Sequence, residues 1–391
     1  MIDGPIASLL DSHRVLVTCG AGGVGKTTTA AALGVAAARR GKRVLVLTID
    51  PARRLAESLG IDMQSADAMT VAPELFEAAG YRATGSLTAM MLDTKRTFDD
   101  LVRKHSSMPE RAEKLLGNKL YQQISSSLAG TQEYMAMEKL IEVRDDDRFD
   151  LIILDTPPTP NALDFLDAPQ KLVDALDSVA IRWFIDAFES SGKFSLNLLA
   201  KSAGVILRGL GKITGGAFLA DMAEVLSQLE DLFGGFKERA ARVQSFLASE
   251  EVRFLVVASP SPVAVQEALF FAGRLRDSRM PCGAFILNQV HGSPSGSAFD
   301  DELIARAETF SDRMRIAGAP LDDDAGSRIA EAYGDAHRIA AHDAKLLAEL
   351  ARSWSRTMPV LAVPRLSQDV HDVRLLGHVS EFLLTAQPVN V

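Results

Sequence analysis

The stretch RVLVTCGAGGVGKTTTAAALGVAAARRGKRVLVLTIDPARR, residues 14–54, decides the fold of this chain. It begins with a short apolar run, Val15–Val17, of the kind that forms a buried strand. A glycine-rich turn follows and opens directly into an alanine-rich helical pattern that ends at Gly41. A second apolar run, Val44–Ile49, then delivers Asp50. The order strand, helix, strand predicts an α/β fold, with a mostly parallel sheet flanked by helices.

The glycine-rich turn matches the phosphate-loop pattern G-x-x-x-x-G-K-[ST] from Gly20 to Thr27. Its glycines allow backbone angles that other residues avoid, so successive amide N–H groups converge on a phosphate. The positive end of the following helix adds to this attraction. Lys26 supplies a cation for the β- and γ-phosphate oxygens, and the hydroxyl of Thr27 is placed to bind Mg²⁺. The turn therefore predicts a site for Mg-ATP.

Composition and charge limit the classes of function. The chain has 391 residues, of which 47% are hydrophobic and 24% are charged, as in an ordinary globular protein. Its 42 basic and 51 acidic residues leave a formal net charge of −9, so summed charge provides no broad basic face for nucleic acid. We therefore expect no nucleic-acid partner.

Cysteine content and hydropathy indicate the compartment. The two cysteines, Cys19 and Cys282, each lie within a strand-like run, which indicates reduced thiols and excludes a CxxC zinc clasp. The seven histidines show no metal-ligand spacing. The first residues lack a secretion signal, and no run of about 18 apolar residues occurs. We expect a cytoplasmic protein without a direct membrane anchor.

Two aspartates follow apolar strands in positions that suit phosphate chemistry. Asp50 can orient the water that attacks the terminal phosphate, or it can simply cap the next helix. Asp155 ends the run Leu151–Leu154, where a phosphate-loop enzyme anchors its magnesium ion, although a plain strand-end turn is the alternative. The phosphate loop upstream favours the functional interpretation of both aspartates.

Four more apolar runs predict strands that complete the sheet: Leu87–Asp93, Phe254–Ala258, Ala284–Leu287 and Val360–Val363. Asn288 follows the third of these runs, at the carboxyl end of the predicted strand. Its amide carries a donor and an acceptor side by side, which can read the edge of a base. Asn288 is therefore a candidate for nucleotide binding.

Two long helical patterns interrupt the strands, at residues 95–143 and 165–249. We expect both to be helical insertions into a single phosphate-loop ATPase domain that spans residues 1–391. In the second block, leucine, methionine and phenylalanine recur along one face. Such a stripe is typical of a packed core and also of an adaptable ligand groove, and both interpretations stay open.

Five features together resemble the arsenite-pump ATPase superfamily, which includes the guided-entry ATPases that carry tail-anchored membrane proteins. They are the GGVGKTT loop, the IDPA turn at Asp50, the DTPPT turn at Asp155, the strand end at Asn288 and the two helical insertions. The features occur in the family's order along nearly the whole chain. The TIDPA and DTPPT motifs look like those of a bacterial branch.

This resemblance implies a set of nucleotide-site residues. The phosphates would be surrounded by Gly22, Gly23, Val24, Gly25, Lys26, Thr27 and Thr28. Thr27 would bind Mg²⁺ directly and Asp155 would hold it through water. Asp50 would position the hydrolytic water and act with Lys26 in catalysis, while Asn288 and Pro364 would frame the adenine. Nucleotide would draw two subunits together, so that the helical insertions present an apolar groove to a protein client.

Three departures from the family pattern affect the mechanism. Ala21 stands where family members carry a lysine that reaches the partner's phosphates. The transition-state cation is then missing or comes from elsewhere, either from Arg53 or Arg54 in cis or from a lysine-bearing homologous subunit in trans. Without a zinc clasp, a dimer depends on packing. The second switch reads TPPTPN at residues 156–161 in place of a glycine-histidine pair, so coupling between nucleotide and groove stays open.

These residues leave three functions open. The first is an ATP-driven targeting or chaperone-like ATPase that holds a hydrophobic client. The second, which Ala21 favours, is a regulatory ATPase that forms a heterodimer with a related ATPase and hydrolyses ATP weakly alone. The third is an energising subunit for anion efflux, which is disfavoured for arsenite because neither cysteine lies in the helical blocks.

Overall fold

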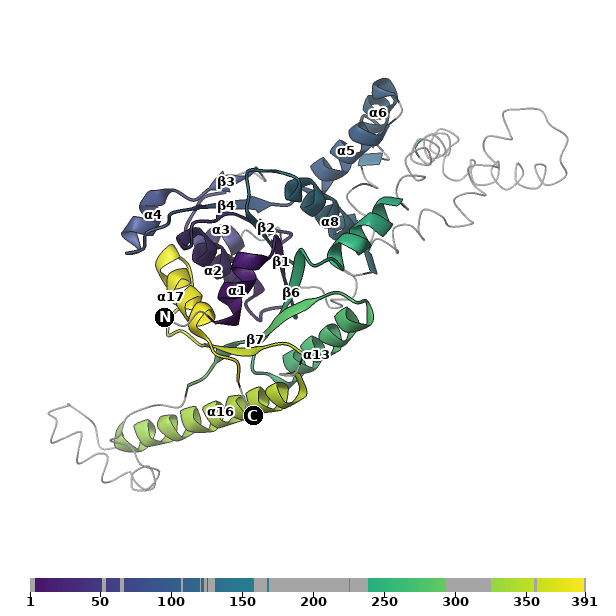
Figure 1. Ribbon diagram of the computed structural model, residues 1–391. Helices are drawn as coiled ribbons and strands as arrows, with labels where there is room; N and C mark the ends of the chain where they lie inside the picture. Colours follow the sequence, from purple (N-terminus) through teal and green to yellow (C-terminus); the bar gives the residue numbers. More distant parts are fainter. Residues whose placement is uncertain are drawn as a thin grey trace, which may run out of the picture.

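The computed structural model describes residues 4–50, 54–63, 67–106, 108–119, 121–122, 125, 131–157, 167–168, 225, 238–292, 325–354 and 357–389. Within these residues, eight strands form one sheet in the order β3-β4-β2-β5-β1-β6-β7-β8 (Figure 1). They are β1 (Val15–Cys19), β2 (Arg43–Thr48), β3 (Met69–Thr70), β4 (Ser86–Met91), β5 (Leu151–Asp155), β6 (Val252–Ala258), β7 (Cys282–Val290) and β8 (Val360–Pro364). Neighbouring strands run parallel, except that β3 pairs antiparallel with β4. The predicted α/β fold is confirmed.

Helices cover both faces of the sheet. They are α1 (Pro5–Ser12), α2 (Lys26–Arg39), α3 (Arg54–Leu59), α4 (Pro73–Ala78), α5 (Thr94–His105), α6 (Pro109–Leu116), α8 (Thr131–Arg144), α13 (Pro262–Asp277), α16 (Ala325–Trp354) and α17 (Val373–Thr385). Side chains of α2 and α17, which pack side by side, belong to one hydrophobic cluster. Side chains of α8, α13 and α16 belong to a second cluster on the opposite face.

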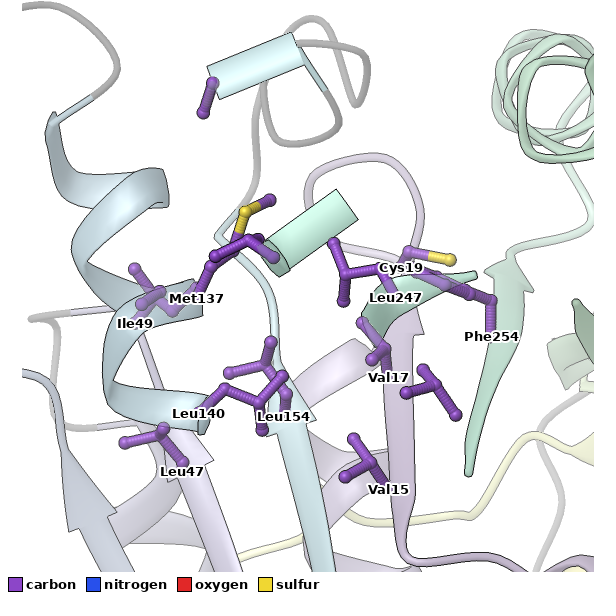
Figure 2. Packing of buried hydrophobic residues seen from close by; sticks show 14 of the residues in the cluster. Val15, Val17, Cys19, Leu47, Ile49, Met137, Leu140, Leu154, Leu247 and Phe254 are labelled. Carbon is purple, nitrogen blue, oxygen red and sulfur yellow. The ribbon is translucent and has the colours of Figure 1, made fainter. Parts of the chain in front are cut away.

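The two clusters follow from the alternation of side chains along each strand. Leu45 and Leu47 of β2 belong to the cluster with α8, whereas Val44 and Val46 belong to the cluster with α2. Because both faces are covered, the strands are continuous apolar runs, and each fully buried Val, Leu, Ile, Phe or Met side chain stabilises the fold by about 1.5–3 kcal/mol. Figure 2 shows the cluster with α8, in which the strand residues Val15, Val17, Leu47 and Leu154 pack with Met137 and Leu140 of α8.

Helix α2 approaches the sheet closely because it is rich in alanine and glycine. A Cβ on Gly34 would lie 2.7 Å from Cγ2 of Val46 and 2.8 Å from Cδ1 of Leu87. A larger residue at Gly34 would therefore push the helix away from β2 and β4. Since α2 begins at Lys26, this close packing also holds the phosphate loop against the carboxyl end of the sheet.

The seven strands predicted from apolar runs are all present, with ends that differ by a few residues. Strand β3 was not predicted, because it consists of two exposed residues and has no apolar run. The predicted helical pattern of residues 95–143 corresponds to α5, α6 and α8, and Figure 1 shows α5 and α6 extending away from the sheet.

Most of the second predicted block, residues 165–249, lies outside the described residues, which include a helical segment at residues 238–247. The division into one domain with two helical insertions therefore stays a prediction. Among the helices that the structure describes, none has both the length and the apolar character needed to cross a membrane.

Candidate nucleotide site

At two glycines of the loop between β1 and α2, both the backbone angle and the lack of space exclude a side chain. Gly20 and Gly25 have φ angles of 147° and 91°, which L side chains rarely adopt. A Cβ on Gly20 would lie 2.0 Å from the carbonyl oxygen of Val257, and one on Gly25 would lie 2.2 Å from Nδ2 of Asn288. The loop thus passes directly over the ends of β6 and β7, and a side chain at either glycine would displace it.

Lys26 begins helix α2 and is held inside the loop. Its side chain is buried, and Nζ donates a hydrogen bond to the carbonyl oxygen of Ala21 at 2.7 Å. Burial lowers the pKa of Lys26 below its usual value; Arg54 adds to this lowering, whereas Asp155 and Asp50 oppose it. The ammonium group is therefore enclosed by the loop and close to both aspartates, as a phosphate-binding lysine requires.

Asp155 lies at the centre of three threonine hydroxyl groups. The strand register places it opposite Thr18 of β1 and Thr48 of β2. Its Oδ2 accepts hydrogen bonds from the hydroxyls of Thr27 at 2.7 Å and Thr48 at 3.0 Å, and its Oδ1 accepts one from Thr18 at 3.4 Å. Burial raises the pKa of Asp155 to about 6, although the hydroxyls of Thr27 and Thr48 favour the carboxylate.

The Thr27 and Asp155 pair fits a magnesium ion by its chemistry. Mg²⁺ prefers hard oxygen donors and is usually held by one or two protein groups together with water and substrate phosphates. A hydroxyl and a buried carboxylate in direct contact, beside the phosphate loop, are such a donor set. In the part of the chain that the structure describes, no group of three or more His, Cys, Asp or Glu side chains could hold a metal ion.

Asp50 follows β2 and is linked to Asp155 through the hydroxyl of Thr48. The backbone N–H of Asp50 donates to the hydroxyl oxygen of Thr48 at 3.2 Å, and Thr48 donates in turn to Asp155. The Asp50 side chain is nearly buried and forms an ion pair with Arg54, with Nε and Oδ2 3.6 Å apart. Arg53, the other arginine considered as a cation in cis, lies outside the described residues.

A cavity of about 420 Å³ is bounded by the phosphate loop, the start of α3 and the segment after β8. This volume lies in the range of roughly 300–1,000 Å³ found for small-molecule sites. The cavity is lined by Gly23, Gly25, Lys26, Thr27, Thr28, Asp50, Arg54, Glu57, Ser58, Thr156, Gln289, Asp369, Val370 and His371. The lining brings together five of the seven predicted phosphate-binding residues and the predicted catalytic pair, Lys26 and Asp50.

Several predicted residues support the cavity without lining it. Gly22, Val24 and Asp155 are not part of the lining, and Asp155 reaches the site through Thr27. Asn288 is buried, and its Nδ2 donates to the carbonyl oxygen of Val24 at 2.9 Å. Pro364 ends β8 and pairs in register with Val290. The predicted contact of Asn288 and Pro364 with adenine stays a prediction.

Two kinds of residue in the site were missed from the sequence. Thr18 and Thr48 are polar residues inside the apolar runs VLVTC and VLVLT, and a polar residue in a buried strand is a signal that it hydrogen-bonds to something. Asp369 and His371 reach the cavity from the segment between β8 and α17, which carries no motif. Only the tertiary fold brings that segment to the loop.

Comparison with known proteins finds a family model and curated relatives that match this chain. A family model described as "Anion-transporting ATPase" matches residues 13–299, a range that contains every predicted site residue except Pro364. The ATPase get3 of Aspergillus terreus is 26% identical over 289 residues, which cover 73% of this chain and 76% of that protein. The ATPase GET3 of Paracoccidioides lutzii is 26% identical over 293 residues, which cover 74% and 77% respectively.

Proposed function

The chain belongs to the anion-transporting ATPase family, and we propose that it binds ATP with Mg²⁺ and hydrolyses it to ADP and phosphate. The observation that most supports this proposal is the hydrogen bond from Thr27 to Asp155. A glycine-rich turn alone connects many strands to helices. A buried carboxylate bonded to the hydroxyl that follows the loop lysine adds a place for the metal ion that phosphate chemistry requires.

Each residue of the site has a role in the proposed reaction. The loop amides and Lys26 bind the β- and γ-phosphate oxygens, and Mg²⁺ bound at Thr27 and Asp155 would neutralise phosphate charge. Asp50 accepts a hydrogen bond from a water molecule and orients its oxygen toward the γ-phosphorus. The new P–O bond forms as the bond to the β–γ bridging oxygen breaks, and the electron pair leaves with ADP. The water proton passes to phosphate or solvent.

We further propose that nucleotide controls the pairing of two subunits and thereby an apolar site for a protein client. The resemblance to the guided-entry ATPases supports this proposal, as does the position of Asp50 and Thr156 on the cavity wall, where they contact whatever fills it. The two free cysteines support a cytoplasmic setting.

A second candidate is a regulatory subunit that acts with a related ATPase. The observation that favours it is Ala21, whose half-buried methyl side chain offers no amine to a partner's phosphates. An anion-efflux role has less support, because Cys19 and Cys282 lie in β1 and β7 and bring no thiolate to a soft anion in the helical blocks.

Equilibrium binding of a fluorescent ATP analogue, with and without Mg²⁺, tests the core of the proposal. We expect Lys26→Ala to abolish binding, because the buried cation that meets the phosphates is removed. Lys345→Ala is the matched control, since Lys345 is an exposed lysine on α16 and does not line the cavity. Equal affinity of Lys26→Ala and the wild type would refute the phosphate-loop assignment.

Sedimentation of the Asp50→Asn variant in Mg-ATP separates the two candidates. Slow hydrolysis in this variant should hold the ATP state. A homodimer in Mg-ATP that dissociates in ADP supports nucleotide-driven pairing. A monomer in both nucleotides, which associates only with an added ATPase of the same family, supports the heteromeric candidate instead.

A further inference from the structure

Among the described residues, the cavity lining contains one lysine and one arginine. The two side chains differ in how exposed they are. Lys26 is 5% exposed and is already bound to the loop carbonyl of Ala21. Arg54 has a side chain that is 55% exposed and forms an ion pair with Asp50. The Lys26 side chain is therefore fixed within the loop, whereas the Arg54 guanidinium lies at the solvent side of the cavity.

Arg54 belongs to a helix whose apolar side chains are buried. Arg54 is the first described residue of α3, and the next residue, Leu55, is buried together with Leu59 at the end of the same helix. Helix α3 packs against both α2 and α17. The long arginine side chain can thus move by several ångströms through its own rotamers while its Cα stays in place.

Arg54 lies close enough to Asp50 to neutralise part of its negative charge. The ion pair between Nε of Arg54 and Oδ2 of Asp50 spans 3.6 Å at the edge of the cavity. The Arg54 charge also reaches Lys26, whose pKa it helps to lower. A carboxylate paired with a guanidinium is a weaker acceptor for a water hydrogen, because the cation already withdraws its charge.

We propose that Arg54 is a catalytic residue in cis, which holds Asp50 in the nucleotide-free chain and transfers to the γ-phosphate oxygens when ATP fills the cavity. This inference rests on the proposed ATPase function. Guanidinium suits the exchange, because its planar donors bind carboxylate and phosphate oxygens in the same bidentate geometry. After the transfer, Asp50 accepts the hydrogen of the attacking water, and Arg54 neutralises charge on the phosphoryl group as the bond to ADP breaks.

The exchange makes the site sensitive to the third phosphate. ADP offers the loop and Lys26 their β-phosphate contacts but gives Arg54 no γ-phosphate, so the Asp50 ion pair persists. ATP supplies the third phosphate and releases Asp50 in the same event. Water activation is thereby confined to the state in which there is a phosphoryl group to transfer.

Binding and single-turnover kinetics of Arg54 variants test this role. We expect Arg54→Ala to bind ADP like the wild type and to bind adenylyl imidodiphosphate about tenfold more weakly, the size of one charge-assisted hydrogen bond. The single-turnover rate of ATP hydrolysis should fall by about 10²-fold or more. Arg54→Lys should recover affinity for the triphosphate but only part of the rate, because a single ammonium does not reproduce the fork of donors.

Arg82→Ala is the control for the loss of an exposed arginine, since Arg82 does not line the cavity. A double-mutant cycle with Asp50→Asn then tests the exchange itself. Asp50→Asn should raise affinity for the triphosphate analogue, because Arg54 no longer has to break an ion pair with Asp50 before it binds phosphate. That gain should vanish in the Arg54→Ala background.

Three results would overturn the inference. Arg54→Ala that hydrolyses ATP at the wild-type rate excludes a catalytic role. Equal losses of ADP and triphosphate affinity make Arg54 a general attractor of anions rather than a γ-phosphate ligand. If Asp50→Asn raises the affinity for the triphosphate analogue equally in the wild-type and Arg54→Ala backgrounds, the exchange is excluded. If the wild type itself neither binds nor hydrolyses ATP, the proposed function fails first, and this inference fails with it.

Discussion

The hydroxyl of Thr48 donates a hydrogen bond to Oδ2 of Asp155 at 3.0 Å and accepts one from the backbone N–H of Asp50 at 3.2 Å. One buried side chain on β2 thus joins the carboxylate proposed to anchor magnesium to the residue proposed to orient water. Parallel pairing makes this contact, because β2 and β5 place Thr48 and Asp155 in register. Metal and water can therefore be positioned relative to each other before any substrate binds.

Replacing Thr48 by valine, a side chain of similar shape, should weaken the binding of Mg²⁺ at the site. The variant removes both hydrogen bonds of the hydroxyl, and a bond to a charged group contributes about 1.5–3 kcal/mol. We expect the Mg²⁺ concentration for half-maximal ATP hydrolysis to rise several-fold in Thr48→Val, and Thr48→Ser to restore it. The rate of hydrolysis measured across a range of Mg²⁺ concentrations tests this prediction. An unchanged titration curve in Thr48→Val would contradict a role of Thr48 in magnesium binding.

The stability of the nucleotide-free chain should carry a pH signature of Asp155. Its pKa is raised from 3.8 to about 6 by burial, so between these values the folded chain binds more protons than the unfolded chain. The free energy of unfolding of the wild type, relative to Asp155→Asn, should therefore fall by about 2 kcal/mol between about pH 4 and pH 7. Urea unfolding of both chains across this range measures the difference. A difference that stays constant with pH would contradict the buried, destabilised carboxylate.

The parts of the site that come from neighbouring residues in the chain could be predicted from the sequence. Lys26, Thr27 and Asp50 lie within one strand, turn, helix, strand unit, and three of the loop glycines, Gly20, Gly23 and Gly25, have backbone angles that favour glycine. The strands were predictable for a related reason: burial on both faces makes them continuous apolar runs.

Tertiary relationships were not predictable in the same way. The strand order places Asp155 between Thr18 and Thr48, and no spacing in the chain encodes that register. Asn288 was singled out as a polar group at a strand end, yet its bond to the carbonyl of Val24 depends on how β7 passes the loop. The ion pair of Arg54 with Asp50 differs from these contacts, because it joins residues only four positions apart and Arg54 was named from the sequence as a cation in cis.

Two glycines with similar backbone angles should respond differently to alanine. Gly25 and Gly80 have φ of 91° and 80°, but a Cβ would meet a close neighbour only at Gly25, where Nδ2 of Asn288 would lie 2.2 Å from it. Gly80→Ala should cost about 1 kcal/mol of stability from backbone strain alone. Gly25→Ala should cost more and should also abolish nucleotide binding. Urea unfolding and ATP binding measure both effects, and equal behaviour of the two variants would contradict the close approach of loop and strand.

Removing the Asn288 amide should loosen the phosphate loop. Asn288→Ala loses the hydrogen bond to Val24, so we expect affinity for both ATP and GTP to fall about tenfold. Competition binding with the two nucleotides measures it. An additional loss confined to ATP would support the predicted contact with adenine, whereas unchanged affinity for both nucleotides would contradict a loop-holding role.

Single-turnover hydrolysis of radiolabelled ATP, with enzyme in excess and Mg²⁺ present, tests the central claim most directly. The wild type should release labelled phosphate, and Asp50→Asn should bind ATP with at least wild-type affinity while hydrolysing it orders of magnitude more slowly. Asp147→Asn, which changes an exposed aspartate in the turn before β5, should hydrolyse ATP at the wild-type rate. Equal rates for the wild type and Asp50→Asn would contradict the account of how this site activates water.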